Sequence, residues 1–158
     1  KTVLSDGLAN IDESSVDDII IAGMGAETII SIISACARLH NADRRFILQP
    51  MSDIPKLRTY LYDNGFTIEK EALAKEGEKF YIIMSVKSAI SDKPKLLDII
   101  YGKLGNGEQE MLYLDNLIYR YERALNGLLK SRKARDKEKT LEYSLILKTL
   151  YDRKRGQN

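Results

Sequence analysis

The chain has 158 residues, 44% hydrophobic and 30% charged, so it can bury a core, yet no apolar run reaches the roughly 20 residues that cross a bilayer. Lys1 to Gly7 lack the apolar segment of a signal peptide. The single cysteine, Cys36, forms no internal disulfide, and with one histidine, His40, it argues against a metal site. These features predict a soluble cytoplasmic protein.

The charge is unevenly distributed along the chain. Residues 1–91 carry 10 basic and 13 acidic side chains, a net charge of −3, whereas residues 92–158 carry 15 basic and 10 acidic side chains, a net charge of +5. The hydrophobic periodicity also changes near Ser91, so we expect domains at 1–91 and 92–158. The positive second part favours a polyanionic partner, with solvated Lys-rich helices as the alternative.

The first part alternates strand and helix patterns. A strand is expected over Asp18–Ala22, a helix over Ala26–Leu39, a second strand in "RRFILQP" and a second helix in "SDIPKLRTYLYDNGF". The second helix would start on a Ser/Asp cap with a proline in its first turn and end at Gly65 in a left-handed cap. This order is typical of β-α-β units around a mostly parallel sheet.

The next segment, "FTIEKEALAKEGEKFYIIMSV", holds two strand-like runs separated by a short polar turn. Such a turn is too short for a helical crossover, so the two strands must be antiparallel. A β-α-β-α order closing in a hairpin is how the later half of a class I methyltransferase domain is built. The predicted fold is therefore α/β, Rossmann-like.

Beyond Asp92 the pattern is helical. A short helix is expected over Pro94–Tyr101, and then apolar residues recur in steps of three and four, as in a coiled-coil seam: Met111, Leu114, Ile118, Tyr121, Leu125 and Leu128. The seam fails around "KSRKARDKEK" and resumes at Leu141, Leu145, Ile146 and Leu150. We interpret this as a helical hairpin; one long kinked helix is the alternative.

The glycines of "DIIIAGMGAETII" raise a separate question. Gly23 and Gly25 at a strand end can permit a tight turn, let a ligand approach the backbone, or expose helix N-terminal amides to an anion. Gly-x-Gly alone does not decide between these uses.

Four stretches, "SDGLANI", "IIIAGMGAETI", "FILQPMSDIPKLRTYLYDNGF" and "EKFYIIMSV", followed by a basic helical tail, resemble the bacterial tRNA (adenine-22-N1)-methyltransferase family. The resemblance implies S-adenosylmethionine-dependent methylation of N1 of an adenine in tRNA. Two positions depart from the family pattern: a further glycine is expected at Ala26 and an asparagine at Met51.

The resemblance also implies that the chain is a carboxyl-terminal portion of such an enzyme. The family's glycine-rich loop for S-adenosylmethionine, and the acidic residue for its ribose, precede the Asp-Gly-Leu turn at which this sequence starts. We therefore expect the isolated chain to bind the cofactor weakly and to be inactive.

Candidate site residues follow from the resemblance and from the strand ends. Cofactor contacts are expected from Asp6, Gly7, Leu8, Ala22, Gly23 and Met24. Adenine contacts are expected from Gly25, Gln49 and Pro50, and tRNA phosphate contacts from Lys130, Arg132, Lys133 and Arg135. The alternatives are a strand-end cap for Gln49, a turn aspartate for Asp6 and a solvated helix tip for the four cations.

No catalytic residue is assigned, because attack by a neutral ring nitrogen on a sulfonium methyl group needs positioning rather than a strong base. Cys36 lies within a helical pattern, which suits a core thiol. Tyrosines at helical spacing, Tyr113, Tyr119, Tyr121 and Tyr143, favour packing over base stacking. Two other functions stay open: a non-catalytic tRNA-binding module, and a helical module that forms homo-oligomers through the seam.

Overall fold

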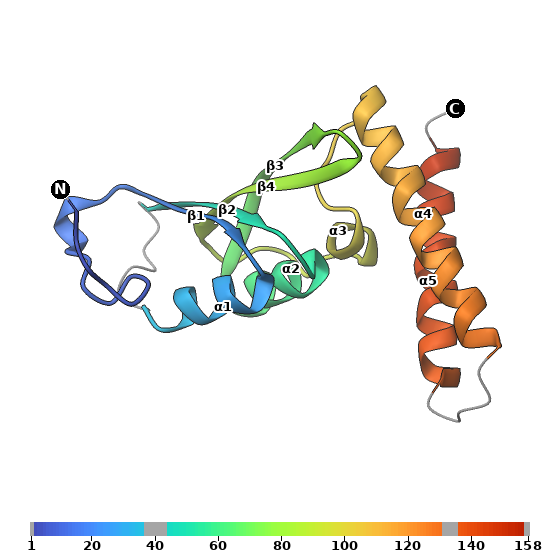
Figure 1. Ribbon diagram of the computed structural model, residues 1–158, viewed down its shortest axis with the longest axis horizontal. Helices are drawn as coiled ribbons and strands as arrows, with labels where there is room; N and C mark the ends of the chain where they lie inside the picture. Colours follow the sequence, from blue (N-terminus) through green and yellow to red (C-terminus); the bar gives the residue numbers. More distant parts are fainter. Residues whose placement is uncertain (1, 37–43, 131–135, 157–158) are drawn as a thin grey trace. The chain divides into compact units, whose positions relative to one another are not determined.

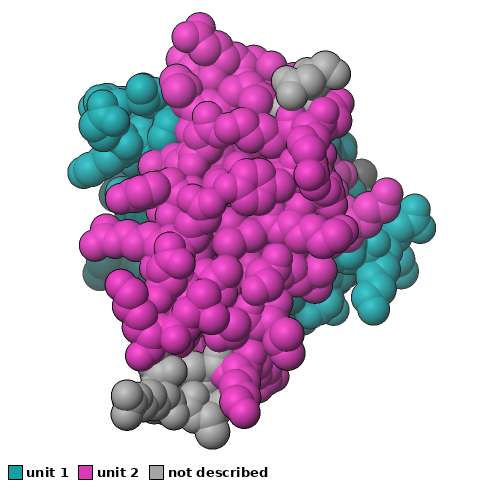
Figure 2. All heavy atoms as spheres, turned by 90° about the vertical axis from the view of Figure 1, so that its right-hand side faces the viewer, with its two compact units in different colours: residues 1–94 teal, residues 95–158 magenta. Residues whose placement is uncertain are grey.

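The computed structural model describes residues 2–36, 44–130 and 136–156 (Figure 1). The chain divides into two compact units, Lys1–Pro94 and Lys95–Asn158, which are coloured separately in Figure 2. Within the described ranges, no helix has the length and apolar character needed to span a membrane.

Unit 1 contains a four-stranded sheet and two α-helices. Its elements are a 3-10 turn at Glu13–Ser15, β1 Asp18–Met24, α1 Ala26–Ser34, β2 Arg45–Pro50, α2 Ile54–Asp63, β3 Phe66–Glu76 and β4 Lys79–Ser88.

The strand order is β1-β2-β4-β3. β1 and β2 are parallel, and β4 is antiparallel to both of its neighbours. The predicted β3–β4 hairpin is confirmed, and Gly77 in its turn has the positive φ of 57° that a tight reversal requires. In the described sheet β1, β2 and β3 run in the same direction; one of the three strand pairs is parallel and two are antiparallel, because the returning strand β4 lies between β2 and β3.

The sheet buries one face against α1 and α2, which lie on the same side of it (Figure 1). Alternate residues of the strands point into this layer, including Ile19, Ile21, Phe46, Leu48, Met84 and Val86. They meet the apolar faces of the two helices at Ile29, Ile33, Leu57 and Leu61. On the opposite face of β1, the Ile20 side chain is 71% exposed. The alternation of residues along the strands therefore reflects a sheet that has one face covered by helices in this unit.

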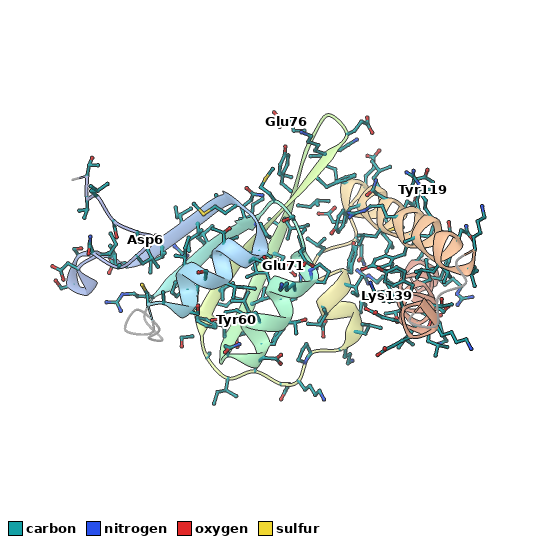
Figure 3. The ribbon with its side chains drawn as sticks, turned by 60° about the horizontal axis from the view of Figure 1, so that its bottom comes forward. Asp6, Tyr60, Glu71, Glu76, Tyr119 and Lys139 are labelled. Carbon is teal, nitrogen blue, oxygen red and sulfur yellow. The ribbon has the colours of Figure 1, made fainter. Side chains whose placement is uncertain are left out.

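A buried ion pair lies within the same layer. The Arg58 guanidinium of α2 contacts Glu71 Oε1 of β3 through Nε and Nη2, both at 2.9 Å, and both side chains are almost fully buried. Glu71 is labelled in Figure 3. The β3 register shifts between Ile68 and Lys70, so an extra residue turns Glu71 toward the core. No local pattern in the sequence indicates this pair.

Two predicted helix boundaries need correction. The first helix ends at Ser34 and not at Leu39, because the backbone turns at Ala35 and the buried Cys36; residues 37–43 lie outside the described ranges. The second helix begins without a side-chain cap, because Asp53 takes a left-handed conformation (φ 52°) in which its side chain makes no cap hydrogen bond. Gly65, with φ 76°, does end that helix region as predicted.

Unit 2 contains three helices: α3 Leu96–Ile100, α4 Glu108–Leu129 and α5 Asp136–Arg155. α4 and α5 run antiparallel side by side, so they are two helices and not one long kinked helix (Figure 1). Their buried contacts come from Tyr113, Leu114, Leu117, Ile118, Ile146, Leu147 and Leu150.

Part of the predicted seam is wrong. Leu141 and Leu145 are 73% and 57% exposed, because the face that α5 buries passes through Ile146, Leu147 and Leu150.

Candidate functional site

Gly23 is an extra residue at the carboxyl end of β1. Ala22 pairs with Gln49 and Met24 with Pro50, so Gly23 bulges out between two consecutive pairs. Its φ is 76°, and a Cβ built on it would meet no heavy atom of the described chain within 4 Å. A side chain here would thus be strained by the backbone and would project into open space.

The Gln49 side chain holds this bulge. The Gly23 amide donates to Gln49 Oε1 at 2.9 Å, while Gln49 Nε2 lies 3.0 Å from the Pro50 carbonyl and 3.4 Å from Met51 Sδ. The amide group is therefore engaged within its own chain. This geometry favours the strand-end cap over direct contact with a base.

Replacing Gln49 with leucine should loosen the bulge at a cost of about 1 kcal/mol, because the exposed Gly23 amide loses its protein acceptor. We expect the Gly23 amide proton to exchange faster with solvent, measured by NMR. Gln49→Glu is the matched control, because it keeps a side-chain oxygen that can accept from Gly23. Unchanged protection of Gly23 in the leucine variant would contradict the clamp.

Gly25 has a different role from Gly23. Its φ is an ordinary −67°, but a Cβ here would come within 3.2 Å of Ser52 Oγ. The two strand-to-helix turns are tied together at this point, since the Met51 amide donates to the Met24 carbonyl at 2.8 Å and the Ala26 amide to the Ser52 carbonyl at 3.3 Å. Gly25 thus allows the two turns to approach, and Gly23 gives the positive φ.

Asp6, Gly7 and Leu8 lie elsewhere in unit 1. They form a turn in which the Asp6 and Leu8 carbonyls accept from the backbone, and Gly7 (φ 56°) lies against Ile32 near the carboxyl end of α1. Gly25 caps the other end of that helix, seven residues or about 10 Å away along its axis. The structure does not bring these three residues to Gly23.

The preceding residues explain this difference. Thr2–Ser5 form no strand, so the expectation that Asp6 follows the end of a strand is wrong in this structure. Val3 and Leu4 are 42% and 95% exposed. The arrangement fits the alternative of a turn aspartate.

Exposed ion pairs flank the two turns. Lys56 Nζ lies 2.5 Å from Glu27 Oε1 and links α2 to the first turn of α1. The hydrogen bond from Lys56 holds the pKa of the Glu27 carboxyl below its usual value. This small stabilising contribution is present above the carboxyl's unfolded-state pKa and is lost as the pH falls through the lowered one.

Of the four predicted phosphate contacts in unit 2, Lys130 is exposed and is the C-cap residue of α4. The other three, Arg132, Lys133 and Arg135, lie outside the described residues. The cations near the end of α5 are engaged within the unit. Lys148 and Arg155 both contact Asp152, Lys154 contacts Asp115, and Arg153 lies over the Tyr101 ring and reaches Asn106. Hydrogen bonds from Arg155 and Lys148 lower the pKa of Asp152.

Three of the four helical tyrosines pack as predicted. Tyr113 is 5% exposed beside Tyr101, and Tyr121 meets Tyr143 edge to face with 5.3 Å between the ring centroids. Tyr119, labelled in Figure 3, differs. It is 61% exposed.

The fold of the chain is similar to that of solved Rossmann-type proteins. It matches a protein of the NADB-Rossmann superfamily from Streptococcus agalactiae with a TM-score of 0.79 and 23% identity, over 95% of this chain and 65% of that one. M. capricolum TrmK, solved with S-adenosyl-homocysteine, matches with a TM-score of 0.69 and 20% identity, over 95% of this chain and 66% of that one. The chain thus has a Rossmann-type α/β fold.

The sequence then defines the family. Residues 1–149 match the model of the tRNA (adenine(22)-N(1))-methyltransferase family, and the chain belongs to it. The Bacillus subtilis tRNA (adenine(22)-N(1))-methyltransferase is 31% identical over 87 residues, which cover 55% of this chain and 37% of that protein. The chain spans 37% to 60% of the lengths of the curated relatives it matches.

Proposed function

We propose that the protein carrying this chain transfers a methyl group from S-adenosylmethionine to N1 of an adenine in tRNA. The observation that supports this most is the open Gly23 bulge, held by Gln49 at the carboxyl ends of two parallel strands. Ligands of open α/β sheets bind at this edge. Family membership gives the reaction class.

The residues at the bulge fit the cofactor. Space that a Cβ would fill is free at Gly23, and Met24 and Met51 are 41% and 53% exposed around it, offering polarizable sulfur to an adenosine or sulfonium group. When bound, S-adenosylmethionine supplies an electrophilic methyl group. We assign Ala22, Gly23 and Met24 to holding it, and we leave Asp6, Gly7 and Leu8 out of this contact because of their place in the structure.

The chain's own residues would position the adenine. Backbone groups at Ala22–Gly25 are suited to the Watson–Crick edge of a base turned out of its stack. Pro50 is buried and keeps the end of β2 rigid, and Gln49 acts through the Gly23 amide and not on the base. Residues 1–91 would then be the later part of a class I methyltransferase sheet, and 92–158 a coiled-coil tail that positions tRNA.

We expect weaker tRNA binding when four cations are changed to alanine: Lys130, Arg132, Lys133 and Arg135. The slope of log affinity against log salt should become shallower by about 3, because each lost phosphate contact reduces it by about 0.7. Filter binding at several salt concentrations measures both. The control is Lys70→Ala with Lys79→Ala, two exposed cations of the β3–β4 hairpin. If the quadruple variant keeps the parent's slope, these four residues do not contact tRNA phosphates.

A second function is favoured by one observation. Leu141 and Leu145 leave an exposed apolar strip on α5, which suits pairing of helices between two copies of the chain. Sedimentation over a range of protein concentrations tests it: a dimer that is lost on changing both leucines to glutamate supports oligomerisation, and a constant monomer mass rejects it.

A further inference from the structure

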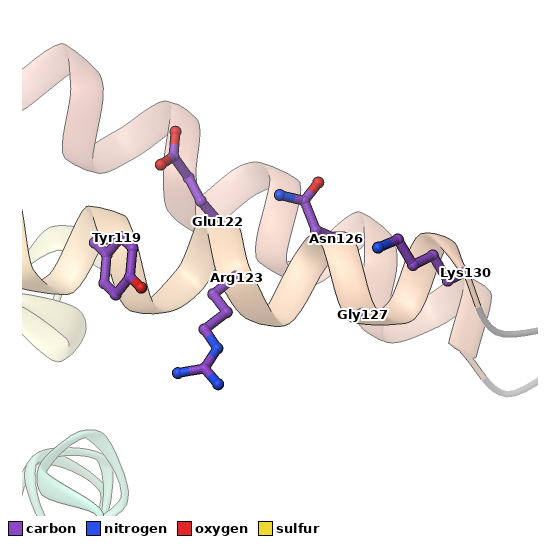
Figure 4. Close-up of a pocket in the computed structure, with 6 residues that line it drawn as sticks. All are labelled: Tyr119, Glu122, Arg123, Asn126, Gly127 and Lys130. Carbon is purple, nitrogen blue, oxygen red and sulfur yellow. The ribbon is translucent and has the colours of Figure 1, made fainter.

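One face of α4 carries a groove that is lined mostly by exposed residues. Tyr119, Glu122, Arg123, Asn126, Gly127 and Lys130 line an open groove on successive turns of the helix (Figure 4). Glu122 forms one border, where its carboxylate accepts from the Tyr151 hydroxyl at 2.5 Å. The other side chains of this set are directed to solvent, and we call Tyr119, Arg123, Asn126 and Lys130 the α4 stripe.

The cations of the α4 stripe differ from those at the end of α5. Lys148, Lys154 and Arg155 are each paired with an aspartate. Arg123 and Lys130 form no ion pair with any of the described residues, and both are exposed. Their charge is thus available to an anion outside the unit.

The aromatic member of the stripe is also available. Tyr119 is 61% exposed, whereas Tyr113, Tyr121 and Tyr143 pack against other rings. An exposed ring on the same helix face as two cations can bind both components of a single-stranded nucleic acid, since the ring stacks on a base and the cations contact phosphates. A paired stem offers no free base face to such a ring.

We propose that the α4 stripe binds an unpaired segment of RNA. Tyr119 stacks on one base, Arg123 and Lys130 contact phosphates, and Asn126 hydrogen-bonds a base edge or a 2′-hydroxyl. Gly127 leaves room beside them, since a Cβ there would meet nothing within 4 Å. From Tyr119 to Lys130 the helix rises about 16 Å, the length of about five stacked nucleotides. The inference rests on the proposed tRNA substrate.

The test uses tryptophan, which the chain lacks. In the Tyr119→Trp variant, we expect indole fluorescence to be quenched by a tRNA transcript and by a short unpaired RNA, and to stay unchanged with a fully paired RNA duplex. Leu141→Trp is the control, because Leu141 is 73% exposed on the other helix. No quenching while anisotropy of labelled tRNA reports binding would overturn the inference.

Affinity gives an independent readout. Tyr119→Ala should weaken tRNA binding about tenfold while Tyr119→Phe binds as the parent, because stacking uses the ring and not the hydroxyl. Arg123→Ala should reduce the salt slope by about 0.7. If all three variants bind tRNA as the parent does and the protein still methylates tRNA, RNA binding by the α4 stripe is refuted and the proposed function stands. If the parent binds no tRNA, both fail.

Discussion

Replacing Arg58 with methionine is expected to lower the free energy of unfolding by about 3–5 kcal/mol, because the Glu71 carboxylate would stay buried without the guanidinium that compensates it. Both side chains lie in the layer between α2 and β3, with exposures of 0% and 1%. Water therefore cannot replace the lost contact without opening the core. Urea denaturation followed by circular dichroism measures the change.

Two controls separate charge burial from packing. The double variant Arg58→Met with Glu71→Leu should regain most of the lost stability, because it removes both buried charges. Asp18→Asn removes one member of the exposed pair with Arg45 and should change stability by less than about 1 kcal/mol. If the single methionine variant unfolds at the parent's urea midpoint, the ion pair makes no such contribution.

Replacing Gly23 with valine is expected to reduce methyl transfer to tRNA at least about 100-fold, because the new side chain would project into the space assigned to cofactor and base. The positive φ of 76° adds backbone strain of about 1–2 kcal/mol or more for a β-branched residue. Initial rates must therefore be compared at equal concentrations of folded protein.

Gly65 is a matched control for this strain. It has the same φ of 76°, and a Cβ there also meets nothing within 4 Å, but it lies in the turn between α2 and β3. Gly65→Val should lose similar stability and keep its transfer rate. If both valine variants lose the same share of the parent's transfer rate, backbone strain, and not occupation of the site, explains the loss at Gly23.

Local signals in the sequence predicted much of the fold. The glycine at position 65 marked the end of α2, and the short turn containing Gly77 required antiparallel strands. The spacing of Leu114 and Ile118 predicted the buried face of α4. Each of these features depends on residues that are near one another in the chain, where backbone preference and periodicity decide the structure.

Features that depend on distant residues were not predicted. Arg58 and Glu71 belong to different elements, and only the register shift in β3 turns the carboxylate inward. The insertion of β4 between β2 and β3 has no local signal either. At the candidate site, the sequence indicated that Gln49 lies near a strand end and predicted that it contacts the adenine, with a strand-end cap as the alternative; its bond to Gly23, 26 positions away, required the structure.

The most direct test of the proposed function is methyl transfer by the protein expressed from its complete gene. Labelled S-adenosylmethionine and two tRNA transcripts are used, one with adenine at position 22, which the family description specifies, and one with guanine there. We predict one methyl group on N1 of that adenine, identified by mass spectrometry of the digested RNA, and none on the guanine transcript. Equal labelling of both transcripts, or no labelling of either, would contradict the proposal.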